Sequence, residues 1–114
     1  MLKKQNRLSK KFEFHVTKKY GTKINGENFY LYFLKPKNYI GLTKIGLVSS
    51  SKTFDTSVKR NRGKRIFREI FRKKFDTIPN DFWIIVYPTK NCLDNKYEKI
   101  SADVDYVLSK IFVA

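Results

Sequence analysis

Nine basic side chains lie within residues 59–74, and they supply the most evident chemistry of this chain. They are Lys59, Arg60, Arg62, Lys64, Arg65, Arg68, Arg72, Lys73 and Lys74. The same segment contains one acid, Glu69. A guanidinium group is planar, always charged and able to bind two phosphate oxygens at once, so an arginine-rich segment favours phosphate binding. We expect this segment to bind the backbone of a nucleic acid.

The charge of the whole chain is concentrated in two places. The 114 residues include 25 Lys and Arg against 10 Asp and Glu, a formal net charge of +15. Residues 1–23 hold eight basic side chains and one acid, and residues 59–74 hold nine and one, while the rest of the chain is neutral. A surface that is cationic only for solubility has positive and negative side chains interspersed. Two concentrated segments are typical of a protein that binds a polyanion.

The second basic segment predicts a long helix over residues 55–75, beginning after Asp55 or Thr56. At about 100° per residue, apolar and basic side chains fall on separate faces. The apolar face holds Ile66, Phe67, Ile70 and Phe71, and the basic stripe holds Asn61, Arg65, Arg68 and Arg72, bordered by Arg60 and Lys64. A solvated face without a ligand is the alternative, but like charges four residues apart mildly destabilise a helix, which favours binding. Asn61 contacts either the ligand or a local backbone group.

The rest of the chain predicts the elements that must position this helix. We expect a helix over 9–20, a strand over 28–34, one bent or two short strands over 39–50, a buried strand over 82–87 and a helix over 95–112. The order α-β-β-β-α-β-α favours an α/β (α+β) two-layer sandwich, with a small mixed sheet of about four strands and three helices. The length predicts one domain, residues 1–114.

Several functional classes are excluded by what the sequence lacks. One cysteine, Cys92, allows no internal disulfide or cysteine-based metal cage, and it favours a reducing compartment such as the cytoplasm. No apolar run is long enough to span a membrane, and the basic start has no apolar signal core. His15 is the only histidine and the acids are dispersed, so we predict no catalytic residue and no metal site in the chain.

Residues 57–72, SVKRNRGKRIFREIFR, resemble the signature of the bacterial ribonuclease P protein component. The resemblance lies in an Arg-Asn-Arg motif, a following Lys-Arg pair and an Arg-Glu…Phe-Arg tail. The resemblance extends over most of the chain. The opening of the family is similar to this chain at Arg7-Leu8, Phe14 and Gly21. Its first strand is similar to residues 29–32, and its next strand is similar to residues 45–47. The segment 48–58, VSSSKTFDTSV, departs from the family by keeping only Lys52 of two paired lysines. Lys18 stands in place of a second aromatic.

This resemblance implies a protein that assists a catalytic RNA, which with Mg²⁺ removes the 5′ leader from precursor tRNA. The implied partners are the ribonuclease P RNA and precursor tRNA, with no obligate protein partner. The residues implied to contact the catalytic RNA are Lys52, Lys59, Arg60, Asn61, Arg62, Lys64, Arg65, Arg68 and Arg72. Phe12, Phe14 and Tyr32 are implied to line a cleft for the single-stranded leader, although Phe12 and Tyr32 suit a packed core equally well.

Two other functions fit the same charge. A ribosomal or other structural RNA-binding protein would need the same cations but would not affect tRNA processing. A basic protein of the membrane surface would use the amphipathic helix 55–75, but we expect the apolar face of that helix to cover the sheet instead.

Overall fold

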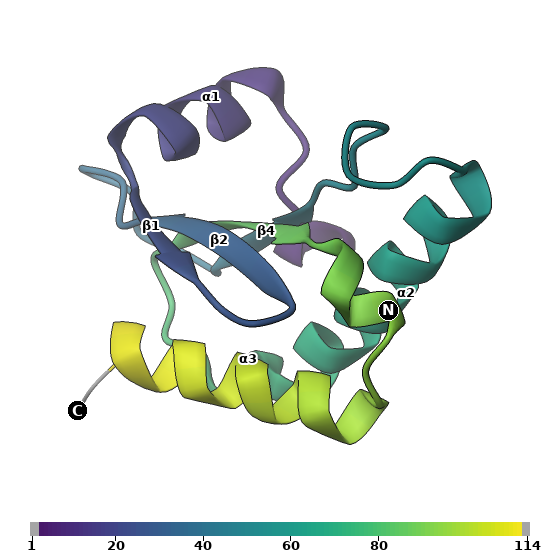
Figure 1. The fold of residues 1–114 in the computed structure, drawn as a ribbon. Helices are drawn as coiled ribbons and strands as arrows, with labels where there is room; N and C mark the ends of the chain where they lie inside the picture. The colour runs from purple at the N-terminus through teal and green to yellow at the C-terminus, as the bar shows by residue number, and fades with distance from the viewer. Residues whose placement is uncertain (1–2, 113–114) are drawn as a thin grey trace.

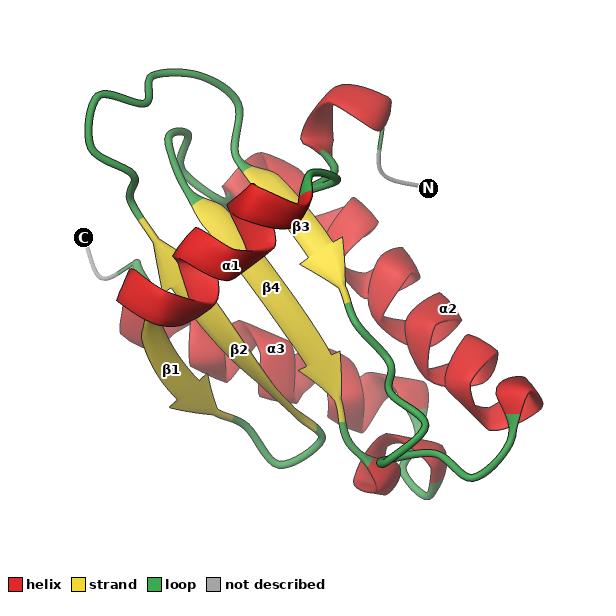
Figure 2. Cartoon of the chain, turned by 90° about the horizontal axis from the view of Figure 1, so that it is seen from above, coloured by secondary structure: helices red, strands yellow, loops and turns green. Residues whose placement is uncertain are grey.

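The computed structural model describes residues 3–112 and places one four-stranded mixed sheet at the centre of the molecule. The strands are β1 (Thr22–Asn25), β2 (Phe29–Leu34), β3 (Lys44–Leu47) and β4 (Trp83–Pro88), and their order across the sheet is β1-β2-β4-β3. The β1–β2 and β2–β4 pairs are antiparallel and the β3–β4 pair is parallel. Figure 2 shows the sheet from above, with β1 and β3 at its two edges.

Three helices cover the two faces of this sheet. They are α1 (Lys11–Tyr20), α2 (Ser57–Lys74) and α3 (Tyr97–Ile111), with short 3₁₀ turns at Lys4–Asn6, Phe75–Thr77 and Lys90–Leu93. Helices α2 and α3 lie on one face and α1 lies over the other (Figure 1). The predicted order α-β-β-β-α-β-α and the mixed sheet are confirmed. The two-layer arrangement is formed by the sheet with α2 and α3, and α1 adds partial cover to the second face.

The main core lies between the sheet and helices α2 and α3. Its buried side chains include Phe29 and Leu31 of β2, Ile84 and Val86 of β4, Phe67, Ile70 and Phe71 of α2, and Ile100, Val104 and Val107 of α3. A smaller cluster under α1 contains Leu8, Trp83 and Ile85. Alternate residues of β4 thus enter the two clusters, which explains why its sequence is apolar throughout. The predictions of a buried strand over 82–87 and of a strand over 28–34 are confirmed by β4 and β2.

Two strand predictions need correction. Strand β1 was not predicted, because its residues are mostly polar and exposed and its sequence therefore shows no alternation. Of residues 39–50, only Lys44–Leu47 form a strand. The chain before β3 is fixed by another segment instead: the Gly41 N–H donates to the Asp81 carboxylate at 2.8 Å, and the Asp81 N–H donates to the Gly41 carbonyl at 2.9 Å.

Helix α1 also differs from its prediction. The sequence predicts a helix over 9–20, in which Phe12, Val16 and Tyr20 recur every four residues and so share one side. In the structure Lys10 precedes the first turn, and Phe12 and Tyr20 are 57% and 66% exposed. The residues that α1 buries are Glu13 and Thr17, both polar.

Helix α2 begins with a side-chain cap, and this contact gives a stability prediction. The Thr56 hydroxyl accepts a hydrogen bond from the Lys59 N–H at 3.2 Å. Because the cap satisfies a free amide of the first turn, Thr56→Ala should lower the free energy of unfolding by about 1 kcal/mol. Urea denaturation measures this change. Asp55→Ala is the control, since this exposed carboxylate only pairs with Lys59 and its loss should change the stability little. Equal losses would contradict the assignment of the cap.

Candidate nucleic-acid interface

Helix α2 distributes its predicted RNA-binding side chains around three hollows of the surface. Lys59 and Arg62 line a hollow of about 360 Å³ beside the turn Lys90–Leu93. Lys64 and Arg68 line a second one of about 240 Å³ against β3. Arg72 lines a third of about 490 Å³ beside the N-terminal turn. The basic face is therefore wider than the single stripe that helical spacing predicted.

Some of these cations already have partners within the chain. The Arg72 guanidinium donates two hydrogen bonds to the Glu69 carboxylate, the shorter at 2.6 Å. Arg60 donates to the carbonyl of Phe54 at 3.3 Å, and its own carbonyl accepts a hydrogen bond from the Ser49 hydroxyl at 3.2 Å. Arg60 therefore ties the segment before α2 to the helix. The Nζ of Lys73 lies 3.8 Å from the Glu69 carboxylate, so Arg72 is the closer of the two cations.

The remaining predicted residues of the basic face are open to solvent. Asn61 and Arg65 of α2 are exposed, and so is Lys52, which lies in a turn over residues 51–53. In this turn the Ser50 hydroxyl hydrogen-bonds with the Thr53 hydroxyl at 3.2 Å. Exposed cations can bind phosphate without first breaking a contact inside the protein.

Phe14 of α1 reaches the same hollow as two of the basic side chains. The hollow of about 240 Å³ is lined by Arg7, Leu8, Phe14, Ile45, Gly46, Leu47, Lys64 and Arg68. The Phe14 ring lies directly over Gly46, where an added Cβ would stand 2.6 Å from a ring carbon. Glycine at this position thus makes room for the ring. An aromatic face beside lysine and arginine is suited to a nucleotide, because the base stacks while the phosphate pairs with the cations.

Three tyrosines continue this surface across the sheet. Tyr30 and Tyr87 stack with ring centroids 4.8 Å apart and an interplanar angle of 7°. Tyr32 stands edge-on to both rings, at 6.3 Å and 5.8 Å. The Nζ of Lys23 lies 4.6 Å from the Tyr30 centroid, and that of Lys18 lies 5.9 Å from the Tyr87 centroid. We call Tyr30, Tyr32, Tyr87, Lys18 and Lys23 the tyrosine–lysine cluster.

Burial favours the uncharged form of Tyr30 and of Tyr87. It raises the pKa of Tyr30, and the neighbouring Tyr32 raises it further. The pKa of Tyr87 is likewise raised by burial and by the nearby tyrosines. Neutral rings do not repel a phosphate backbone, and the two lysines attract it, so the cluster can hold unpaired RNA.

The structure places Phe12 apart from these groups. Its ring meets Trp83 edge-on at 6.1 Å, and residues 12 and 14 point to nearly opposite sides of α1. The role of Phe12 in a leader cleft stays a prediction. Tyr87 was not among the predicted residues. Tyr87 lies on the same face as Ile85, because alternate residues of a strand share a face, but only the register of β2 with β4 brings it beside Tyr30.

Cys92 and His15, the other side chains with reactive groups, are not among the residues that form this surface. Burial raises the pKa of the Cys92 thiol to about 11, so this cysteine is protonated at neutral pH. His15 is exposed on α1. Within residues 3–112, no three of the His, Cys, Asp and Glu side chains come together as they would to hold a metal ion. In the same part of the chain, no helix has the length and apolar character needed to cross a membrane.

Comparison with known proteins identifies the family. The family model "Ribonuclease P" matches residues 2–112. A ribonuclease P protein component from a Pseudanabaena species is 32% identical over 110 residues, which cover 96% of this chain and 94% of the relative. The chain belongs to the bacterial ribonuclease P protein component family. As a member, it is a subunit of the ribonuclease P endoribonuclease, acts in tRNA processing and associates with the ribonuclease P RNA.

Further relatives agree in sequence and in fold. The ribonuclease P protein component of Thermotoga petrophila is 34% identical over 97 residues, covering 85% of this chain and 80% of the relative. The solved ribonuclease P protein of Thermotoga maritima has a TM-score of 0.78 at 27% identity, covering 93% of this chain and 97% of that one. A Staphylococcus aureus ribonuclease P protein mutant has a TM-score of 0.79 at 26% identity, covering 95% and 88%. The family fold therefore extends over nearly the whole chain.

Proposed function

We propose that this ribonuclease P protein binds the 5′ leader of precursor tRNA on the face of the sheet beside α1. The observation that carries the proposal is the hollow in which Phe14 meets Lys64 and Arg68. Stacking on unpaired bases needs aromatic faces, and the phosphates between those bases need cations. The tyrosine–lysine cluster supplies both groups on neighbouring strands of the same face.

We assign the contacts with the ribonuclease P RNA to helix α2. Four exposed side chains of α2 lie on the side away from the core that Phe67 and Phe71 anchor: Lys59, Asn61, Arg62 and Arg65. The half-buried Arg68, which also borders the Phe14 hollow, completes the set. Helix α2 thus has one face in the protein and a basic face toward solvent, where a folded RNA can meet it. The turn with Lys52 lies just before the same helix and extends the basic surface.

In this proposal the RNA subunit, with Mg²⁺, performs the hydrolysis, and this chain supplies binding. Most of the acidic side chains that the structure describes contact other groups of this protein. Glu13 pairs with Lys44, Glu69 with Arg72 and Asp105 with Lys74, and the carboxylate of Asp103 accepts hydrogen bonds from the turn before β2. These carboxylates are separated and do not fit a metal centre, so we assign no metal ion to the described part of the chain. Precursor tRNA and the RNA subunit are the proposed partners, with no further protein required, and the cytoplasm is the proposed location.

Cleavage of precursor tRNA by the cognate RNA subunit tests the function. The protein should raise the cleavage rate most strongly at low Mg²⁺, because its cations replace ions that the two RNAs otherwise need to approach each other. The rate is measured with and without protein across a magnesium series. No enhancement at any concentration, combined with tight binding to ribosomal RNA, would favour a structural RNA-binding protein instead.

A further inference from the structure

Helix α1 meets the sheet through two buried polar side chains as well as through partly buried apolar ones. Phe12 and Tyr20 are exposed, while the partly buried Phe14 and Val16 pack against the smaller cluster under the helix. The side chains of α1 that are buried are Glu13, 2% exposed, and Thr17. The position of α1 therefore depends in part on what Glu13 and Thr17 contact.

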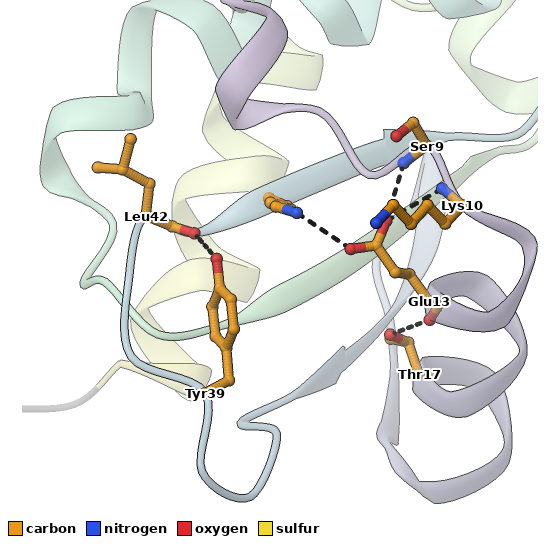
Figure 3. A network of polar contacts seen from close by, with 7 residues as sticks. Ser9, Lys10, Glu13, Thr17, Tyr39 and Leu42 are labelled. Carbon is orange, nitrogen blue, oxygen red and sulfur yellow. Dashed lines mark hydrogen bonds and ion pairs between the residues drawn. The ribbon is translucent and has the colours of Figure 1, made fainter.

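The Glu13 carboxylate joins three elements (Figure 3). One oxygen, Oε1, accepts hydrogen bonds from the N–H groups of Ser9, at 3.3 Å, and Lys10, at 3.0 Å, which closes the start of the helix. The other, Oε2, pairs with the Nζ of Lys44 on β3 at 3.1 Å. The Glu13 carbonyl accepts a hydrogen bond from the Thr17 hydroxyl at 2.7 Å, within the helix.

These contacts keep Glu13 charged. Burial alone raises its pKa, but the hydrogen bonds from Lys10, Lys44 and Ser9, with the charge of Lys44, outweigh burial and lower the pKa. The groups that face the carboxylate are therefore the two backbone amides of its own segment and the ammonium group of β3. With these donors, the buried carboxylate holds the start of the helix against the sheet.

The next residue along α1 is Phe14, which lies over Gly46 of the same strand. Lys44 and Gly46 are alternate residues of β3 and share a face of the sheet. The ion pair Glu13–Lys44 and the contact Phe14–Gly46 thus join the same two elements, side by side. Any shift of α1 that breaks the first contact moves the Phe14 ring relative to Lys64 and Arg68.

We propose that Glu13 and Lys44 are positioning residues for the single-stranded leader, because their ion pair fixes α1 over β3 and holds Phe14 at the RNA-binding hollow. This inference rests on the proposed function, since it assumes that the leader binds there. Removing the Lys44 charge leaves the buried Glu13 carboxylate without its cation, which disfavours the arrangement that buries it. Removing the Glu13 charge takes away the group that holds the partly exposed Lys44 ammonium against the helix. Helix α1 then shifts, while α2 and α3 keep their core on the other face of the sheet.

Glu13→Gln and Lys44→Met, made separately, test the inference. Each variant should bind a single-stranded oligoribonucleotide with the leader sequence about tenfold more weakly, as expected when a stacked base loses much of its contact. Binding to the ribonuclease P RNA alone should stay unchanged. In hydrogen exchange, the amides of Ser9 and Lys10 should exchange faster, and those of α2 and α3 should exchange as before. Fluorescence anisotropy and exchange mass spectrometry provide the two measurements.

Two further variants separate positioning from general stability. Lys44→Arg keeps the charge and should retain the affinity for the leader oligonucleotide. Asp105→Asn removes the 2.8 Å ion pair with Lys74 between α3 and α2, and it should not affect leader binding. Unchanged leader affinity in both Glu13→Gln and Lys44→Met, with the wild type binding well, would overturn this inference alone. A parallel loss of leader and ribonuclease P RNA binding would also overturn it. A wild-type protein that does not bind the oligonucleotide would overturn the proposed leader site as well.

Discussion

Replacing Arg65 and Arg68 together by alanine should weaken binding to the ribonuclease P RNA by about ten- to a hundredfold at moderate salt. Each guanidinium forms charge-assisted contacts with phosphate oxygens, which are stronger than neutral hydrogen bonds. Each lost phosphate contact also reduces the number of counterions released on binding. The slope of log affinity against log salt should therefore fall by about two units. A titration at several salt concentrations, followed by filter binding, measures both quantities.

The fold should survive this double substitution. Arg65 is exposed and Arg68 is half-buried, while the residues that anchor α2 in the core, Phe67 and Phe71, are unchanged. Lys96→Ala with Lys99→Ala is the matched control, because it removes the same charge from exposed positions at the start of α3. If the control lowers the slope equally, the effect reports net charge and not a contact. An unchanged slope in the arginine variant would remove this part of α2 from the interface.

Helix α2 was predictable because its signals agree with one another. Its apolar period, its cap and its arginines all describe one amphipathic helix, and the structure gives Ser57–Lys74 where residues 55–75 were expected. Strand β4 was predictable for a different reason: its continuous apolar run is buried on both faces. In both elements the burial pattern follows directly from the local sequence.

The missed features depend on contacts between distant segments. Strand β1 exists because it pairs with β2, and its own residues are too polar and exposed to show a period. Glu13 lies on the buried side of α1, where its carboxylate pairs with Lys44 of β3. Helical spacing alone would place this carboxylate in solvent. Tyr87 joins Tyr30 only through the register of β2 with β4. A single sequence without pairing information does not specify such partners.

The same distinction applies to the candidate RNA-binding residues. Spacing along α2 put Asn61, Arg65, Arg68 and Arg72 on one stripe. The three hollows that α2 borders depend on β3, the N-terminal turn and the turn Lys90–Leu93, and so on tertiary structure. The charge that a surface presents is thus readable from sequence, whereas the shape of that surface is not.

Tyr32→Ala should selectively reduce the affinity for precursor tRNA over mature tRNA. Base–aromatic stacking contributes about 1–3 kcal/mol per base, so loss of the ring should weaken binding of the leader by about five- to a hundredfold. Mature tRNA has no leader, and its affinity for the holoenzyme should not change. The ratio of the two dissociation constants, measured with the reconstituted holoenzyme, is the relevant quantity. Tyr32→Phe keeps the ring and should retain most of the preference.

The competing explanation for Tyr32 is packing, since its ring stands edge-on to both Tyr30 and Tyr87. Tyr106→Ala provides the matched control, because this tyrosine is 59% exposed on α3, has a lysine over its ring at 4.5 Å, and lies on the helix layer away from α1. It should leave the preference for precursor unchanged. If Tyr32→Ala weakens both tRNAs equally and lowers the melting temperature, the ring supports the sheet and does not bind the leader. A selective loss without a change in melting temperature places an unpaired base of the leader on the tyrosine–lysine cluster.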